Sequence, residues 1–404
     1  MAIEHMGDRM ARLRRLADLT QEGLAERSGV SVDVIRKLEQ RRKHSARLPT
    51  LHLLAKGLGV ELTALLGDPP AVPSSGDVDP PQLVAVRRAI MPPLFAPPME
   101  PTGAERLSPA LLRAELADGW TLYHSAEFGR LMDVLPGIIA DARLLAAVGN
   151  ADERAAGQAA LGKGLQLGGH LAIRLGKTDL ALAALERAYA AAGDSSDPLL
   201  APMVSNSVAW AYQRQARLDD ARNLAVYAAD GVEREHSAAA EGVRVWGGLL
   251  MSAATSYARS DDYDTANLMM RTAERAAGRL AKLPPPADGR LVSVFSRSSV
   301  RIERVRLAVQ HERPEEALTL AKGIRLSADT PPSWRTWLFL DVARAYTDVG
   351  DAEGAVKALE SLRRVAPGWM RHHTLAVAIV TDLWAGTARP VGLRKLAQFL
   401  GVTE

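Results

Sequence analysis

Residues 20–40 read TQEGLAERSGVSVDVIRKLEQ, and their order predicts two short helices joined by a tight turn. Thr20 is placed to cap the first helix and Ser31 to cap the second, because a hydroxyl there accepts a hydrogen bond from the first-turn backbone. Gly29 stands where the first helix must end in a left-handed conformation that a side chain would resist. The stretch therefore predicts a helix, a turn and a second helix.

The second of these helices has two distinct faces. At roughly 100° per residue, Val34, Ile35 and Leu38 fall on one arc. The opposite arc carries Val32, Asp33, Arg36, Lys37 and Gln40. A recognition helix needs this division, because its apolar side packs on the preceding helix while its polar residues reach base edges in the major groove. We therefore interpret the stretch as a DNA-binding helix-turn-helix.

Residues 19–67 resemble the N-terminal domain of the Xre family of bacterial transcription regulators, relatives of the phage repressors. The resemblance is carried by LTQEGLAERSGVSVDVIRKLEQ and, after a short gap, by LPTLHLLAKGLGVELTALLG. It implies a lambda-repressor-like bundle of five short helices. It also implies that Gln21 touches a phosphate and braces the recognition helix, and that Gln40 contacts the DNA backbone. The base-reading positions implied by the resemblance are Val32, Asp33, Arg36 and Lys37.

Two of these base-reading positions are ambiguous. Val32 departs from the family pattern, which often has a polar residue there, so it either touches a thymine methyl group or contributes little. Asp33 either accepts a hydrogen bond from a cytosine amine or repels phosphate.

Positive charge is concentrated near this motif. Residues 1–67 carry twelve Lys or Arg and eight acidic residues, whereas the whole chain has a net charge of only +3. Arg41, Arg42, Lys43 and Arg47 follow the recognition helix directly. We expect them to contact phosphates, because phosphate contacts supply most of the sequence-independent affinity for DNA.

Length and composition exclude several classes of protein. A chain of 404 residues is long enough to hold two or more domains, and the absence of cysteine excludes disulfides and thiolate zinc sites. The first twenty residues are charged, and no apolar run approaches the roughly 18 residues of a membrane span. We expect a cytoplasmic, nucleoid-associated protein with no membrane partner.

Three regions follow from the pattern along the chain. Residues 1–67 form the predicted DNA-binding domain, with a first helix whose Leu16 faces inward and whose Arg14 faces outward. Residues 68–108 are a Pro-rich linker that begins DPPAVPSSGDVDPP and contains one short helix near residues 82–91. Residues 109–404 are almost continuously helical, so the fold class is all-α.

The helical region repeats. Five segments align on the small residue that opens the second helix of a helix pair, with separations of 40, 45, 51 and 38 residues: Ala181, Ala221, Ala266, Ala317 and Ala355. Small or aromatic residues stand nine positions earlier: Ala172, Tyr212, Tyr257, Ala308 and Tyr346. Seven positions later stand Ala188, Ala228, Ala273, Ile324 and Leu362. The pattern resembles tetratricopeptide (TPR) repeats, which implies an α-solenoid. A segment at residues 123–142 is interpreted as a further, divergent unit.

A solenoid of this kind has a concave groove lined by the first helix of each pair. The predicted groove residues are Gln166, His170, Asn206, Trp210, Thr255, Arg306 and Arg344. Arg, Asn and Gln suit the carboxylate and backbone amides of an extended peptide, and Trp210 offers an apolar anchor. The alternative is that these are ordinary polar faces of helices.

The C-terminal tail predicts two more helices with an apolar stripe. Leu393, Leu396 and Leu400 either cap the solenoid or pair with a second subunit, and capping is the interpretation we favour.

No catalytic motif emerges. GQAALGKG at residues 157–164 lacks the hydroxyl residue of a P-loop, and LGKT at residues 175–178 lacks its first glycine. Neither segment follows a predicted strand. We expect no enzymatic activity, no cofactor and no metal site.

The joint architecture, an Xre-like head on a TPR body, resembles bacterial regulators that sense peptide pheromones. It predicts a homodimeric, sequence-specific DNA-binding transcriptional regulator that is controlled by a ligand in the groove. A peptide is the first expectation for that ligand, and a small-molecule effector is an alternative. A second alternative is a TPR scaffold that binds another protein and is localised by its helix-turn-helix.

Overall fold

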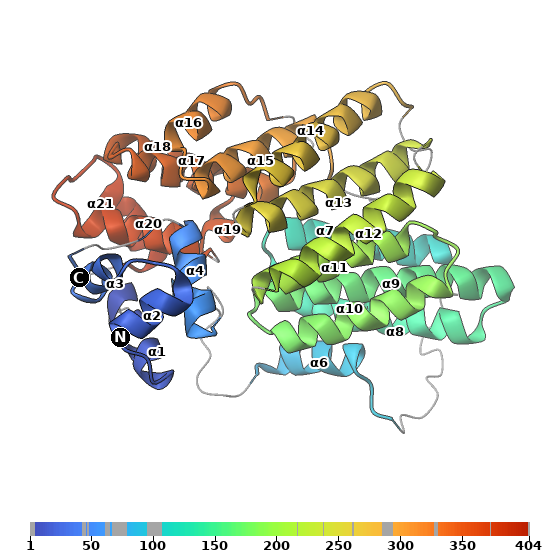
Figure 1. Ribbon diagram of the computed structural model, residues 1–404. Helices are drawn as coiled ribbons and strands as arrows, with labels where there is room; N and C mark the ends of the chain where they lie inside the picture. Colours follow the sequence, from blue (N-terminus) through green and yellow to red (C-terminus); the bar gives the residue numbers. More distant parts are fainter. Residues whose placement is uncertain are drawn as a thin grey trace.

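The computed structural model describes residues 5–42, 46, 48–60, 65–66, 79–94, 107–215, 217–236, 238–260, 262–284, 294–326, 330–371 and 373–402. Every regular element in these ranges is a helix (Figure 1), as the sequence predicts. Lys43, Arg47 and most of the predicted fifth helix of the N-terminal domain lie outside the described residues.

The N-terminal domain contains four labelled helices. They are α1 (Met6–Leu16), α2 (Gln21–Ser28), α3 (Val32–Glu39) and α4 (Leu48–Leu58). Met10, Leu24, Ile35 and Leu38 are fully buried between them. Among the described residues, this apolar core shares no member with that of the body.

The ends of α2 and α3 are where local sequence places them. Thr20 Oγ1 accepts a hydrogen bond from the backbone of Gly23 at 2.9 Å, and Ser31 Oγ accepts one from Val34 at 3.4 Å. Gly29 has a φ of 71°, the left-handed conformation that favours glycine. The predicted helix, turn and helix are confirmed.

Two expectations for α1 are wrong. Leu16, the last residue of α1, is 73% exposed, because Leu13 and Leu19 on either side of it are the residues that pack against the core. Arg14 is not on the outer face. Its guanidinium lies against Glu39 of α3, with a nitrogen–oxygen distance of 2.7 Å.

The body is built of consecutive helix pairs. In chain order these are α7 (Pro109–His124) with α8 (Phe128–Val148), α9 (Ala151–Arg174) with α10 (Thr178–Gly193), α11 (Leu200–Arg214) with α12 (Leu218–His236), α13 (Ala240–Arg259) with α14 (Tyr263–Leu280), α15 (Arg297–Gln310) with α16 (Pro314–Lys322), and α17 (Pro332–Asp348) with α18 (Ala352–Val365). The five marker alanines all lie near the start of a second helix and are at most 2% exposed. The predicted repeats and the divergent first unit are therefore confirmed, except that Ile324 lies beyond the end of α16.

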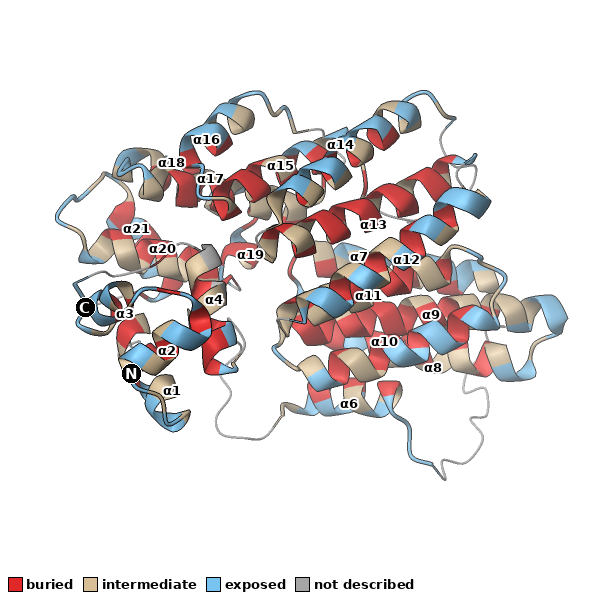
Figure 2. Cartoon of the chain, viewed as in Figure 1, coloured by how far each residue is buried: buried red, intermediate tan, exposed pale blue. Residues whose placement is uncertain are grey.

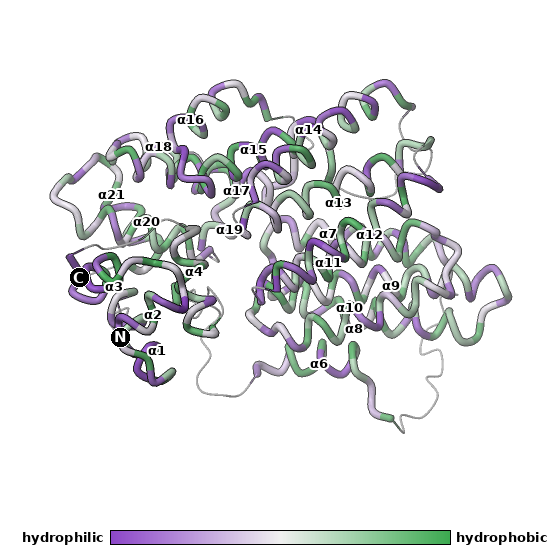
Figure 3. Tube along the Cα trace, viewed as in Figure 1, coloured by the Kyte–Doolittle hydropathy of each residue, from purple (hydrophilic) through white to green (hydrophobic). Residues whose placement is uncertain are grey.

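Buried residues concentrate where the helix pairs stack, on α9, α11 and α13 (Figure 2). Hydrophobic and hydrophilic residues alternate along most helices (Figure 3). This is the pattern expected of helices that each pack on neighbours along one face.

The helix predicted inside the linker belongs to the body. α6 (Pro81–Ile90) buries Leu83, Val86 and Ile90 in the body's core. Asp79, just before α6, lies 2.6 Å from the guanidinium of Arg87 and 2.7 Å from the ammonium of Lys177. The prediction that residues 79–90 belong to a linker is therefore wrong, because apolar burial and these ion pairs fix them to the solenoid.

The C-terminal helices close the end of the array. They are α19 (Pro367–Arg371), α20 (Thr374–Ala385) and α21 (Leu393–Leu400). Leu393, Leu396 and Leu400 are buried in the body's own core, which supports capping and leaves this stripe inaccessible to a second subunit.

Candidate functional site

The outward face of α3 carries the predicted base-reading residues. Asp33, Arg36 and Lys37 are exposed, and Val32 is partly exposed. Ile35, on the opposite face, is fully buried. The structure thus places the four predicted base-reading residues on one accessible surface, while the aliphatic side anchors the helix.

Carboxylates lie close to the cations of this surface. Lys37 Nζ is 2.7 Å from a carboxylate oxygen of Asp33, one helical turn earlier. Arg36 is 3.9 Å from Glu22 of α2, and both side chains are largely exposed. Exposed pairs of this kind are worth little, so they do not hold the two cations against exchange for phosphate or base partners.

The orientation of α3 is fixed by Glu39. Arg14 of α1 donates to both oxygens of this carboxylate, at 2.7 and 2.9 Å, and Gln21 Nε2 of α2 donates to it at 2.7 Å. Burial raises the pKa of Glu39, but the hydrogen bonds from Arg14 and Gln21 outweigh burial and leave that pKa below its ordinary value. Gln21 therefore braces the recognition helix, and its phosphate contact stays a prediction.

Cations continue past the end of α3. Gln40, Arg41 and Arg42 are exposed, and Arg41 donates from Nε to Asp8 of α1 at 3.2 Å. That hydrogen bond holds Arg41 beside the end of the recognition helix. Phosphate contacts for these residues remain predictions.

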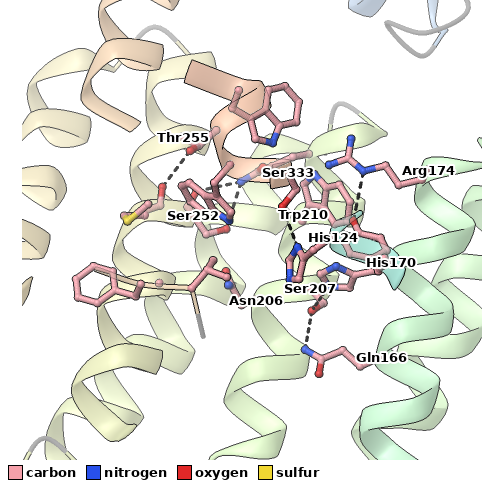
Figure 4. Close-up of a pocket in the computed structure, with 18 of the residues that line it drawn as sticks. His124, Gln166, His170, Arg174, Asn206, Ser207, Trp210, Ser252, Thr255 and Ser333 are labelled. Atoms are coloured by element: carbon pink, nitrogen blue, oxygen red, sulfur yellow. Dashed lines mark hydrogen bonds between the residues drawn. The ribbon is translucent and has the colours of Figure 1, made fainter. Parts of the chain in front are cut away.

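The second candidate site is a cavity of about 610 Å³ on the concave side of the body. The labelled side chains of α9, α11 and α13 converge on it in Figure 4. Its wall includes these predicted groove residues: Gln166, His170, Asn206, Trp210, Thr255 and Arg306. The structure corrects the prediction for Arg344. It does not belong to the lining, because its guanidinium is buried and pairs with Asp348 at 2.9 Å.

Hydrogen bonds between repeats hold the cavity wall. Ser207 Oγ lies 2.9 Å from Gln166 Nε2 and 2.8 Å from His170 Nε2, which joins α11 to α9. Thr255 Oγ1 donates to Glu303 Oε1 at 2.7 Å, which joins α13 to α15. The polar groups are therefore positioned by one another and by the stacked helices.

The histidines of the cavity are neutral at pH 7. Burial lowers the pKa of His124 to about 4 and that of His170 to about 3, and the positive charge of Arg174 adds to both shifts. His373 is affected in the same direction, again mainly by burial. These rings contribute aromatic surface and hydrogen-bonding groups without charge.

The cavity also contains a strongly perturbed carboxyl group. Burial raises the pKa of Asp341 to about 7, with Arg306 opposing the shift and Glu303 adding to it. A cleft that holds several perturbed titratable groups is a typical binding site.

Sequence reasoning missed the arginines of the cavity. Arg174, Arg214 and Arg259 all line it, and each is the last residue of a first helix. Each also stands seven residues before a marker alanine, so the repeat alignment contained the signal that would have found them. The guanidinium of Arg174 lies 4.9, 5.5 and 4.6 Å from the ring centres of Trp210, Trp337 and Trp369.

The two ends of the solenoid meet at this cavity. Trp369 Nε1 of α19 donates to the carbonyl oxygen of His124 at 2.6 Å. His124 Nδ1 lies 2.8 Å from the hydroxyl of Ser333 on α17. We call Trp369, His124 and Ser333 the seam. It joins the first helix pair to the last, so the two ends of the predicted concave groove meet and the cavity lies inside a closed ring of helices.

Comparisons with known proteins match only part of the chain at the level of sequence. Residues 10–65 match the helix-turn-helix family. No curated protein matches the chain. Among solved structures, BtubC (BKLC) from P. vanneervenii is 17% identical, with 64% of this chain and 92% of that chain covered and a TM-score of 0.40. The Rap protein complexed with competence and sporulation factor is 13% identical, with 73% and 87% covered and a TM-score of 0.45.

No helix in the described part of the chain is long and apolar enough to cross a membrane. The family match coincides with the capped α2, the left-handed turn at Gly29 and the exposed face of α3. Residues 10–65 are therefore a helix-turn-helix domain of the Xre type, a kind of domain that binds DNA.

Proposed function

We propose that this protein is a sequence-specific transcriptional regulator, not an enzyme, whose affinity for DNA is controlled by a ligand in the cavity of the solenoid. The observation that carries the proposal is the combination of an exposed recognition helix with a preformed cavity in one chain. Leu66, at the end of the N-terminal domain, is among the residues that line the cavity. That contact offers a direct route from a bound ligand to the DNA-binding domain.

The effector and the assembly belong to the same proposal. A peptide is the first candidate effector, because the cavity wall offers amide and guanidinium groups beside Trp210. The protein acts as a homodimer whose two recognition helices read half-sites about one helical turn apart. A ligand shifts the arrangement of the two heads, and so their fit to the operator, through its different affinity for the two arrangements.

Selection of bound duplexes from a random pool tests the DNA-binding half. The full chain should enrich one sequence, and Arg36→Ala should weaken binding to it by about 1–3 kcal/mol and relax the preference at one position. Arg130→Ala, an exposed change on α8, is the matched control. If the wild-type chain enriched no sequence, or if Arg36→Ala left the selected operator unchanged, the assignment of α3 as the reading helix would be wrong.

Native mass spectrometry of protein purified from its own host tests the ligand-controlled half. A co-purifying peptide or small molecule, which changes operator affinity when it is removed, would support it. A stoichiometric protein partner on the solenoid would favour the scaffold alternative instead.

A further inference from the structure

The cavity carries a row of equivalent arginines. Arg174, Arg214 and Arg259 end the first helices α9, α11 and α13, and each lies seven residues before a marker alanine. Stacked repeats place equivalent positions side by side, so the three guanidiniums follow one another along the wall. Each sits at a helix C-terminus, where the helix dipole favours a cation. The fold thus tolerates three like charges at the cavity.

The lining has an excess of positive charge. Among its described residues the cations are Arg113, Lys163, Arg174, Arg214, Arg259 and Arg306. Only Glu303 and Asp341 are carboxylates in that set, and they lie 3.3 and 4.0 Å from Arg306. Lys163 is balanced from outside the lining by Asp197 at 2.9 Å. Both lining carboxylates therefore lie next to Arg306, and the described lining carries more cations than carboxylates.

The charges of the row act on one another. Burial lowers the pKa of Arg259 to about 9, and the positive charges of Arg214 and Arg306 lower it further, against a smaller opposing effect of Glu303. The repulsion between these like charges is strong because the cavity is partly shielded from water. An anion that enters the cavity is attracted by all of them and offsets that repulsion.

Arg174 is held by aromatic rings rather than by a carboxylate. Its Nε lies 3.3 Å from the hydroxyl of Tyr123, and the indoles of Trp210 and Trp369 lie within 5 Å of its guanidinium carbon. None of the ion pairs among the described residues involves Arg174. The aromatic contacts fix its position and leave its charge uncompensated.

A buried hydrogen-bond donor also indicates that the cavity suits an anion. His373 lines the cavity and is 8% exposed. Its Nδ1 accepts from the backbone of Leu375 at 3.3 Å, so in the neutral ring the proton is on Nε2. In the described structure Nε2 has no hydrogen-bond partner. A buried N–H without a partner is costly, and an anionic oxygen is the strongest acceptor it can meet.

We infer that the cavity binds a compact organic anion. Arg174, Arg214 and Arg259 bind its carboxylate or phosphate group, and His373 donates to it. A flat apolar part of the ligand packs on Trp210 and Trp337, whose rings line the same space. This inference rests on the proposed function, because it gives the chemical class of the effector. A volume of about 610 Å³ suits a small organic acid or the C-terminal residues of a short peptide equally.

Calorimetric titration of the full chain with matched pairs of probes tests this inference. The pairs are naphthalene-2-carboxylate and its amide, 2-naphthyl phosphate and 2-naphthol, and a tetrapeptide ending in phenylalanine as free acid and as C-terminal amide. At least one anion should bind about tenfold or more tightly than its neutral counterpart, which corresponds to about 1.4 kcal/mol. Preference for the free peptide over the small acids identifies a peptide carboxylate as the source, and the reverse identifies a small acid.

Variants locate the binding site. Arg174→Gln should abolish the preference for the anion, Arg174→Lys should retain part of it, and Arg130→Gln on α8 should leave it unchanged. Arg259→Gln provides a second test should Arg174→Gln fail to fold. The inference would be overturned if charged and neutral probes bound with equal affinity, or if no anion bound at about 1 mM. It would also be overturned if folded Arg174→Gln and Arg259→Gln kept the preference for the anion. None of these measurements uses DNA, so their failure leaves the helix-turn-helix assignment and control by a neutral ligand intact.

Discussion

At the scale of single residues, the aromatic lining decides which groups of the cavity are charged. The ring of His170 lies about 5–6 Å from those of Trp120, Tyr123 and Trp210, measured between ring centres at 5.1, 5.7 and 5.0 Å. These rings exclude water from the imidazole, and Arg174 adds like charge to the penalty for protonation. The histidine is therefore kept neutral while the arginines stay charged, which makes the cavity selective for anions over cations.

The same burial predicts a pH dependence of stability. The pKa of His170 is about 3 in the folded protein, below the ordinary value of 6.5, so the unfolded chain binds a proton that the folded chain does not. Stability should fall as the pH drops from 6.5 toward 3, by about 2 kcal/mol from this residue between pH 6.5 and 5. His170→Gln should flatten the decline in Tm over that range. Identical slopes for wild type and variant would contradict the assignment, and His236→Gln on α12 serves as the control.

Arg42 allows the phosphate contacts to be tested separately from base reading. It is exposed just past α3, so Arg42→Gln should weaken binding to all duplexes alike. The slope of log affinity against log salt concentration should fall by roughly one, because one counterion fewer is released. A change confined to the selected operator, with the salt slope intact, would instead make Arg42 a base-reading residue.

At the scale of helices, the recognition helix depends on a single carboxylate. Glu39 joins α3 to Arg14 of α1 and Gln21 of α2. Glu39→Ala leaves the Arg14 guanidinium, 14% exposed, without this partner and should destabilise the N-terminal domain by about 2 kcal/mol. Hydrogen exchange of α3 in the full chain measures the effect, and Glu26→Ala on the exposed face of α2 is the control. Equal protection of α3 in both variants would show that apolar packing alone orients it.

Local sequence predicted correctly the helix boundaries that are set by residues close to them in the chain. Both ends of α2 and the start of α3 follow from Thr20, Gly29 and Ser31, each of which acts within four residues. The inward position of Arg14 does not, because its partner is 25 residues away on another helix. α6 was misread as part of a linker for the same reason, since Lys177, in the turn between α9 and α10, pairs with Asp79 just before α6.

At the scale of the whole molecule, closure of the solenoid converts a groove into a cavity. Repeat periodicity predicts contacts between neighbouring repeats only. The seam joins residues 245 positions apart, where Trp369 donates a hydrogen bond to His124, and no local sequence pattern predicts this contact. Six of the predicted groove residues line the cavity because the repeats alone place them, whereas its enclosure and the position of Trp369 against Arg174 depend on the seam.

The seam predicts a coupled response of ring closure and ligand binding. Trp369 is 1% exposed, and its ring lies edge-on to those of Tyr123 and Phe128. Trp369→Ala should remove about 3–5 kcal/mol of packing where α19 meets the first helix pair. Trp369→Phe, which keeps the ring and loses the N–H donor to His124, should cost about 1 kcal/mol. The alanine variant should show a larger radius of gyration in small-angle scattering and faster hydrogen exchange in α7 and α19.

Trp384→Phe on α20 is the control for this experiment, because Trp384 lies outside the seam and does not line the cavity. A variant Trp369→Ala with unchanged scattering and exchange would show that stacking of consecutive repeats suffices to hold the ring.

If the ring opens, an anion that binds wild type should bind Trp369→Ala more weakly, because opening admits water to the arginine row and removes an indole from Arg174. Any ligand that prefers the closed ring must in turn stabilise the seam, by the reciprocity that links binding to conformation.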